Sequence, residues 1–324
     1  MTEMKRFLLV FLSLSVAASV SAVDLNFRVR KHLERAPETF LWVSDVQFSP
    51  CHPENLSGEK AVVSAVMRHN PSFVLNGGDF VEDKPAHDAV CIASGWDNPS
   101  ISGPWDFQLF ESTWSPVVDS LGKNNLYGVA GNHDFWADAT WAYAHKDSYL
   151  VRDGIFFLML NVSGPTDSSI PTWDNDWAEK MLSSEEAQNA QFRIVIFHEP
   201  GTTNRSGGWN NSQMAQTIRE KLYPLFSEYR VDAILNGHIH TYRRWMENGI
   251  IHVISGGGGG GFQGDAGDVV NSSNYHNFIE FHKEFDGVTG DWRLSASVVG
   301  IDMTNPNEPE EYQIDSFEIN SQSK

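Results

Sequence analysis

The chain has 324 residues and 41% of them are hydrophobic, which is enough to bury a substantial core in one large domain or two small ones. Its formal net charge of −19 disfavours binding to nucleic-acid backbones and to anionic membranes, because like charges repel. A phosphorylated substrate would be repelled in the same way. A site for one therefore needs a local positive centre, and bound metal ions are the obvious source.

The N-terminus has the anatomy of a secretory signal peptide. A basic pair that starts at Lys5 precedes an apolar stretch, and Val20 and Ala22 stand at the −3 and −1 places of a cleavage site. The apolar stretch is too short for a membrane span, and no later run in the sequence is long enough for one. We therefore expect residues 1–22 to be removed and residues 23–324 to fold as one domain outside the cytoplasm. A buried N-terminal helix is the alternative.

Short runs rich in β-branched and aromatic residues recur along the chain and predict strands. Helix-like segments lie between several of them, at residues 58–70 and 212–229. This alternation of buried strands and helices predicts an α/β fold with sheets covered on both faces. In chain order the predicted strands lie within residues 40–46, 72–79, 126–134, 155–162, 192–200, 231–240, 250–258, 277–285 and 292–303.

Three stretches rich in Trp, Asn and Gly interrupt this alternation, at residues 81–123, 135–153 and 201–212. We expect them to be loops, because segments of that length without regular structure are usually functional or mobile. They either line a substrate site or are surface loops whose tryptophans pack small clusters. The part from residue 275 to residue 319 is predicted to form alternating strands, and it carries no apparent chemistry.

The predicted strands end in a consistent way, in residue types that bind metals. Ligands bind beyond the carboxyl ends of strands in α/β sheets, so we expect these side chains to converge at one rim. A lone buried histidine is more often structural than a ligand, but five strand ends with such residues are hard to explain by chance. The candidates are Asp45 and Gln47 after the first strand, Asp79 after the second, Asn132, His133 and Asp134 after the third, His198 after the fifth, and His238 and His240 after the sixth.

Carboxylate, amide and imidazole groups together suit divalent or trivalent first-row metals. Two ions about 3.5–4 Å apart can clamp both the attacking and the leaving oxygen of a phosphoryl transfer. The glycines before Asp79, Asn132 and His238 would let the backbone turn sharply and leave room beside the ions.

The ordered set "SDVQ", "NGGD", "AGNHD", "FHEP" and "NGHIH" resembles the calcineurin-like metallophosphoesterase superfamily. The phrase "NGHIHTYRR" followed by "IIHVISGGGGG" is most similar to its purple acid phosphatase branch. The resemblance implies a four-layer α/β/β/α sandwich of two mixed sheets flanked by helices, with the metal site at the C-terminal ends of the strands. It implies hydrolysis of a small phosphorylated substrate, most simply by a phosphomonoesterase. A phosphodiesterase or nucleotide pyrophosphatase is one alternative, and a metal-containing binding protein without turnover is another.

The same resemblance assigns roles to the candidate residues. It implies two metal ions (Mn, Fe, Zn, Mg or Ca) that share Asp79, with a bridging hydroxide as the nucleophile. His133, oriented by Asp134, would act as general acid or donor at the leaving oxygen, although it could also only buttress its loop. The implied ligands are Asp45, Gln47, Asp79 and His240 for one ion, and Asp79, Asn132, His198 and His238 for the other.

Three arginines are candidates for contacting a substrate phosphate, because a guanidinium offers two donors to such oxygens. They are Arg205, Arg243 and Arg244, and for each of them a surface ion pair is the alternative. The amide of Asn132 is a further candidate for substrate binding. The sequence leaves the oligomeric state open.

Two residues depart from the pattern of the purple acid phosphatases. Those proteins carry a tyrosine ligand three residues after the G-D aspartate, where this chain has Glu82, so we do not expect the purple colour or a requirement for ferric iron. Gln47 stands where the superfamily usually has His. Because an amide oxygen is a harder ligand than an imidazole nitrogen, Gln47 favours manganese, magnesium or calcium over zinc.

Cys51 and Cys91 are the only cysteines, and such a pair in a secreted chain predicts one disulfide. Two separate buried thiols are the alternative. The bridge would close a loop of about 40 residues, contribute on the order of 3–4 kcal/mol, and tie together the loops that follow Asp45 and Asp79. Five Asn-x-Ser sequons are compatible with glycosylation in a eukaryotic host, at Asn55, Asn161, Asn204, Asn210 and Asn271.

Overall fold

The structure is a computed structural model, and it divides into two compact units, Met1–Glu38 and Thr39–Lys324. All elements described below belong to the second unit. The predictions about the signal peptide, Glu82, Arg205 and the two cysteines fall outside the described residues. The residues described are 38–47, 53–81, 104–134, 147–162, 173–203, 208–261, 275–305 and 308–320.

One six-stranded mixed sheet, sheet A, has the strand order β12-β11-β10-β1-β2-β3. The pairs β1–β2 and β2–β3 are parallel, whereas β10 pairs antiparallel with β1 and with β11, and β11 pairs antiparallel with β12. The strands are β1 (Thr39–Val43), β2 (Phe73–Asn76), β3 (Leu126–Gly128), β10 (Tyr275–Phe285), β11 (Trp292–Asp302) and β12 (Glu310–Asn320).

The other six-stranded mixed sheet, sheet B, has the strand order β4-β5-β6-β7-β9-β8. Its four central strands are parallel, and both edge strands are antiparallel to their neighbours. The strands are β4 (Ser148–Arg152), β5 (Ile155–Met159), β6 (Phe192–Ile196), β7 (Ala233–Asn236), β8 (Tyr242–Glu247) and β9 (Ile250–Ser255).

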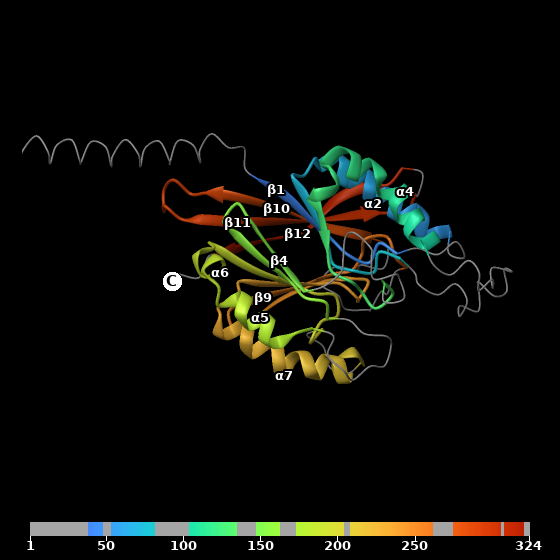
Figure 1. Ribbon diagram of the computed structural model, residues 1–324. Helices are drawn as coiled ribbons and strands as arrows, with labels where there is room; N and C mark the ends of the chain where they lie inside the picture. Colours follow the sequence, from blue (N-terminus) through green and yellow to red (C-terminus); the bar gives the residue numbers. More distant parts are fainter. Residues whose placement is uncertain are drawn as a thin grey trace, which may run out of the picture. The chain divides into compact units, whose positions relative to one another are not determined.

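The two sheets pack face to face through an aromatic core (Figure 1). The Phe40 ring of β1 stacks on Phe73 and Phe281 within sheet A, at centroid distances of 4.9 and 4.8 Å. It meets Phe157 of sheet B edge-on at 5.3 Å. Because successive side chains of a strand point to opposite faces, Leu41 packs on the other side of sheet A, in the core beneath the helices. Strands buried on both faces therefore appear in the sequence as continuous apolar runs.

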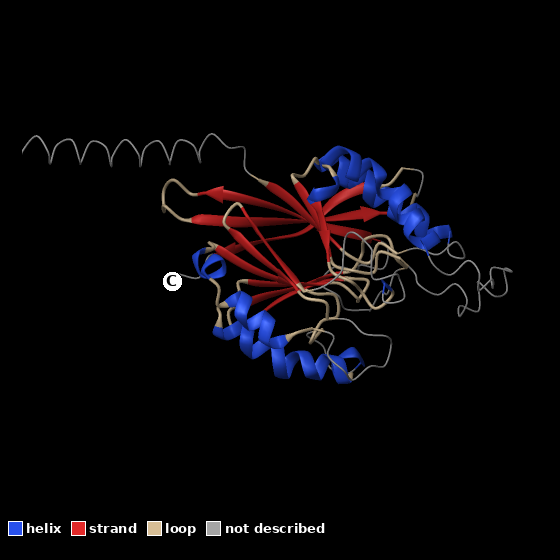
Figure 2. Ribbon diagram, in the orientation of Figure 1, coloured by secondary structure: helices blue, strands red, loops and turns tan. Residues whose placement is uncertain are grey.

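Helices cover the outer face of each sheet, as Figure 2 shows. Sheet A is covered by α2 (Pro53–His69) and α4 (Pro104–Leu121), and sheet B by α5 (Asn175–Leu182), α6 (Glu185–Asn189) and α7 (Gln213–Glu228). The predicted α/β class and the four-layer α/β/β/α sandwich are thus confirmed, as are the predicted helices around residues 58–70 and 212–229. In the described part of the chain, no helix combines the length and the apolar character needed to cross a membrane.

The prediction that residues 81–123 form a loop is wrong in part, because this stretch contains α4. Phe110, Trp114 and Val117 lie one helical turn apart and are buried against sheet A, so tertiary packing orders a segment whose composition resembled a loop. The stretch 135–153 likewise contains β4. The strand β8 was not predicted, since most of its residues are not buried and it forms no apolar run.

Candidate metal centre

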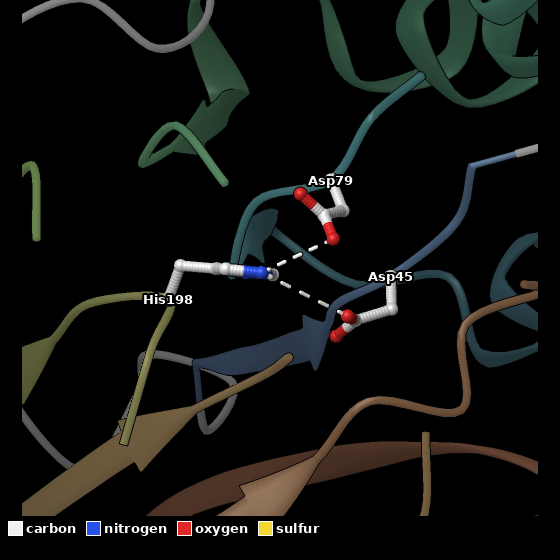
Figure 3. A group of neighbouring side chains, drawn as sticks. All are labelled: Asp45, Asp79 and His198. Atoms are coloured by element: carbon white, nitrogen blue, oxygen red, sulfur yellow. Dashed lines mark ion pairs between the residues drawn. The ribbon is translucent and has the colours of Figure 1, made fainter. Parts of the chain in front are cut away.

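The predicted metal ligands converge where β1, β2 and β3 of sheet A end next to β6 and β7 of sheet B. Three of them, Asp45, Asp79 and His198, each offer a ligand atom within 4.8 Å of the others (Figure 3). His198 Nε2 lies 3.1 Å from Asp79 Oδ2 and 4.0 Å from Asp45 Oδ1. None of the three residues is more than 1% exposed. Two carboxylates so deeply buried need a compensating positive charge.

The family resemblance assigned the candidates to two groups that share Asp79. In the first group, which we name the Gln47 half-site (Asp45, Gln47, Asp79 and His240), Gln47 Nε2 lies 3.5 Å from Asp79 Oδ2 and 3.3 Å from His240 Nε2. His240 Nε2 lies 3.4 Å from Asp45 Oδ1. The four side chains thus surround one point at the end of β1.

The second group, the Asn132 half-site (Asp79, Asn132, His198 and His238), is held together in the same way. Asn132 Oδ1 lies 3.1 Å from His198 Nε2 and 2.8 Å from His238 Nδ1. An amide oxygen and ring nitrogens from three different loops therefore point toward the same place. The structure thus brings the side chains of all the predicted ligands close together around Asp79.

Backbone carbonyls fix the orientation of two of the histidine rings. His198 Nδ1 donates to the Gly77 carbonyl at 2.8 Å, and His240 Nδ1 donates to the Gly261 carbonyl. A carbonyl can only accept, so in each ring Nδ1 carries a proton and Nε2 is the atom that faces the carboxylates. Such outer contacts are typical of histidines that bind metals.

A proton on His198 offsets part of the negative charge in the site. Burial lowers the pKa of His198, but the charges of Asp79 and Asp45 outweigh this and raise it to about 10. Burial by itself would raise the pKa of Asp79, but the charge and the hydrogen bond of His198 lower it. Burial and the charge of His198 lower the pKa of His238 to about 3, so this ring is neutral. A bound metal ion would take the place of the His198 proton.

Gln47 provides a test of whether these residues fit a metal. Its side chain is 2% exposed, and its Oε1 atom has no hydrogen-bond partner within the described ranges. Buried amide oxygens nearly always have a partner. Rotating the amide by half a turn exchanges the positions of its oxygen and nitrogen. The oxygen would then point toward Asp79 and His240, as it must if all three side chains bind the same metal ion. The donor set and the unpartnered oxygen both fit a metal ion.

The backbone around the site adopts conformations that few residues tolerate. Asp45, Asp79 and His238 have positive φ angles of 60°, 53° and 69°. Strained backbone of this kind persists where the surroundings fix it, often at functional sites. At Gly78 the φ angle is 100°, and at Gly131 a Cβ atom would overlap the Asp79 carboxylate. These two positions therefore require glycine.

The loop after β3 carries His133 and Asp134, the two predicted catalytic residues. The backbone N–H of His133 donates to Asp79 Oδ1 at 2.9 Å, and its side chain is partly exposed beside the site. The Asp134 carboxylate is 7% exposed and accepts from the backbone N–H groups of Phe80, Val81 and Gly131 at 2.9, 3.3 and 2.8 Å. Burial and the charge of Asp79 raise the pKa of Asp134 to about 7. These contacts tie the β2 and β3 loops together.

The two described arginines have different surroundings. Arg243 is 7% exposed, and its Nη1 donates to the Thr203 carbonyl at 3.4 Å. Arg244 is exposed and pairs with Asp315 of β12, with 2.8 Å between Nε and Oδ2. Arg244 thus has the surface ion pair that was the alternative for each of these residues.

Trp209 lies at the site but was not among the predicted site residues. It belongs to the 3₁₀ turn η4 (Gly208–Asn211), and its ring centroid lies 4.2 Å from that of His238. The only signal in the sequence was its place in one of the Trp-rich stretches. The contact of the Gly261 carbonyl with His240 was not predicted either, although the glycine run that follows β9 had been part of the family resemblance.

Comparison with known proteins shows to which family the chain is similar. The family model for the calcineurin-like phosphoesterases matches residues 38–242. Among curated proteins, the chain is 20% identical over 238 residues to purple acid phosphatase 21 of Arabidopsis thaliana, covering 71% of this chain and 44% of that protein. It is 24% identical over 169 residues to purple acid phosphatase 22 of the same plant, covering 42% of this chain and 37% of that protein. The chain spans less than half the length of these curated relatives.

Solved structures share the fold. The purple acid phosphatase PPD1 from yellow lupin (Lupinus luteus) seeds superposes with a TM-score of 0.61 and 18% identity, over 89% of this chain and 54% of that one. GAP50, described as the anchor in the inner membrane complex of Plasmodium, superposes with a TM-score of 0.53 and 16% identity, over 90% of each chain.

Proposed function

Because the chain belongs to the calcineurin-like phosphoesterase family, we propose that it is a dinuclear, metal-dependent phosphomonoesterase. The observation that carries this proposal is the convergence of the buried candidate ligands around Asp79. Each half-site supplies carboxylate, amide and imidazole groups, which is the mixture that first-row metals accept. A single structural ion pair would not need two further histidines and two amides around it.

The proposed ions would be held by the Gln47 half-site and the Asn132 half-site. When bound, they supply the positive charge that neutralises phosphate oxygens and lowers the pKa of water, which an acidic protein cannot provide by its side chains alone. Gln47 in place of a histidine gives the first half-site one more oxygen ligand. We therefore propose manganese, magnesium or calcium there rather than zinc.

The chain itself would position the substrate and supply the proton for the leaving oxygen. His133 follows Asn132 directly, and its backbone is anchored to Asp79 by a hydrogen bond of 2.9 Å. This anchor holds the partly exposed His133 ring next to the site, where the ring can donate to the leaving oxygen. Asp134 orders the loop that carries His133, and Arg243 and Asn132 are the proposed substrate contacts in the described ranges. Arg205 is a proposed contact from its sequence alone.

Secretion, the Cys51–Cys91 disulfide and glycosylation are part of the same proposal. They are supported by the signal-peptide pattern, the even cysteine count and the five sequons. The disulfide has a direct test, because it would join the loops after Asp45 and Asp79. Reduction should weaken metal binding, and equal metal affinity of the reduced and oxidised protein would contradict this role.

Turnover of p-nitrophenyl phosphate and of its bis-ester, measured with each divalent metal in turn, tests the proposed function. We expect two ions per chain by metal analysis, and a higher kcat/KM for the monoester than for the bis-ester. His133→Ala should lower kcat while two ions stay bound. Preference for the bis-ester would favour a phosphodiesterase. No turnover of either ester with any metal, in protein that binds two ions, would favour a binding protein.

A further inference from the structure

The indole of Trp209 lies against a proposed metal ligand. Its ring centroid is 4.2 Å from that of His238, with the two ring planes tilted by 54°. His238 Nδ1 in turn lies 2.8 Å from Asn132 Oδ1, which places the indole beside the Asn132 half-site. Trp209 packs partly against the core cluster beneath α5 and α7 and is only partly buried, so part of this residue remains accessible to solvent.

Hydrogen bonds of Trp209 and of its neighbour Asn210 hold this tryptophan in place. Its Nε1 donates to the Pro200 carbonyl at 2.6 Å, close to the metal-ligand loop that carries His198. The next residue, Asn210, accepts from the backbone N–H of Thr203 at 2.7 Å through its side chain, and its carbonyl accepts from Arg219 Nη2 at 2.9 Å. A side chain fixed in this way loses little entropy when a ligand packs on it.

The chemistry of Trp209 differs from that of the rest of the site. The ligand side chains are carboxylates, amides and imidazoles, which would hold the metal ions that bind a phosphate but cannot distinguish the group esterified to it. Trp209 offers an apolar, flat surface within reach of such a group, since a phosphate bound at the Asn132 half-site lies next to His238. A flat aromatic group can stack on it, whereas a small polar alcohol gains nothing there.

We propose that Trp209 is a specificity-determining residue that favours phosphate monoesters of aromatic groups. The inference rests on the proposed function, because it assumes that a phosphate binds at the two half-sites. Stacking on one aromatic side chain corresponds to roughly 5- to 100-fold in affinity. Trp209→Leu should therefore weaken the binding of aromatic ligands by about this factor and leave the affinity for other ligands unchanged.

Equilibrium binding tests the inference without any need for turnover. Calorimetric titration of the metal-loaded, full-length protein with phenylphosphonate, methylphosphonate and inorganic phosphate gives three dissociation constants. We expect the wild-type protein to bind phenylphosphonate at least five-fold more tightly than methylphosphonate. Trp209→Leu should abolish this preference and leave the affinity for inorganic phosphate unchanged, whereas Trp209→Phe should retain most of it.

Trp177 of α5 provides the matched control, because it is partly buried and packs against the same core cluster as Trp209, and no contact with a candidate metal ligand is seen for it in the described ranges. Trp177→Leu should keep the preference for phenylphosphonate. Equal binding of the two phosphonates by the wild-type protein would overturn the inference without any variant. A similar loss for all three ligands in Trp209→Leu would also overturn it, because Trp209 would then only support His238. If binding shows the preference but no ester is turned over, the proposed function fails and the binding preference stands.

Discussion

Replacement of Asp134 by alanine should cause one of the largest losses of stability at the site. The carboxylate accepts from three backbone N–H groups, those of Phe80, Val81 and Gly131, at 2.8 to 3.3 Å. Phe80 is 1% exposed and Val81 is 3% exposed, so water cannot readily replace the lost acceptor. In Asp134→Ala all three donors would lose this acceptor.

The expected magnitude follows from the cost of an unsatisfied buried donor. Each costs about 1–3 kcal/mol, so three of them at the lower end amount to a loss of about 3 kcal/mol. Asp134→Asn keeps one side-chain oxygen as acceptor and should lose less. Asp174→Ala is the control, since Asp174 accepts from one backbone N–H at the exposed start of α5, and removal of such a cap costs about 1 kcal/mol.

Urea unfolding of the three variants and the wild-type protein, all stripped of metal with a chelator, gives the free energies of unfolding. Without metal, differences in ion binding do not enter the comparison. The loop-ordering role of Asp134 is refuted if Asp134→Ala loses less than Asp174→Ala. In that case the importance of Asp134 would lie in its effect on His133, and would be visible in kcat rather than in stability.

Three further predictions concern the pairing of His69, the core contact of Phe40 and the stabilisation by metal. The pKa of His69 is raised mainly by its hydrogen bond with Glu280, so its stabilising effect is present below about pH 6.5 and is lost as the pH rises through the raised value. The difference in Tm between wild type and His69→Gln should therefore shrink at alkaline pH, and a constant difference would contradict the pairing. Phe40→Ala, at the contact between the sheets, should lose about 3–5 kcal/mol in urea unfolding, whereas Val288→Ala, 95% exposed, should stay within about 0.5 kcal/mol. Metal at 100 times its Kd should stabilise the protein by about 2.7 kcal/mol, and Asp79→Asn should lose most of that gain in a thermal melt, because Asp79 belongs to both half-sites.

Much of the fold could be predicted because buried strands and helices have recognisable patterns of apolar residues in the sequence. Strands such as β5 and β6 are buried at every residue, so each appears as an unbroken apolar run. The prediction was poorest at α4, whose surroundings are rich in Trp, Asn and Gly, and at β8, where most residues are not buried. Their structure depends on partners elsewhere in the chain rather than on a pattern of their own.

The candidate ligands could be predicted because each motif is short and ends a strand. What each side chain contacts could not be predicted. Asp134 was expected to orient the ring of His133, and the structure adds three backbone contacts that order the loops. Trp209 is not a metal-ligand type, and apart from its place in a Trp-rich stretch nothing in the sequence indicated that it lies next to His238.

By itself, the sequence determined the α/β class, and it marked the candidate ligand residues and their order along the chain, because these depend on local burial and on short motifs. Only the tertiary structure decided which of these side chains lie next to one another. The backbone N–H of His238 bonds to an Asp45 oxygen that is 193 residues away in the chain, and Gln47 meets His240 across the same separation. Contacts over such distances arise when two sheets pack and bring their strand ends together, and a linear pattern carries no measure of that packing.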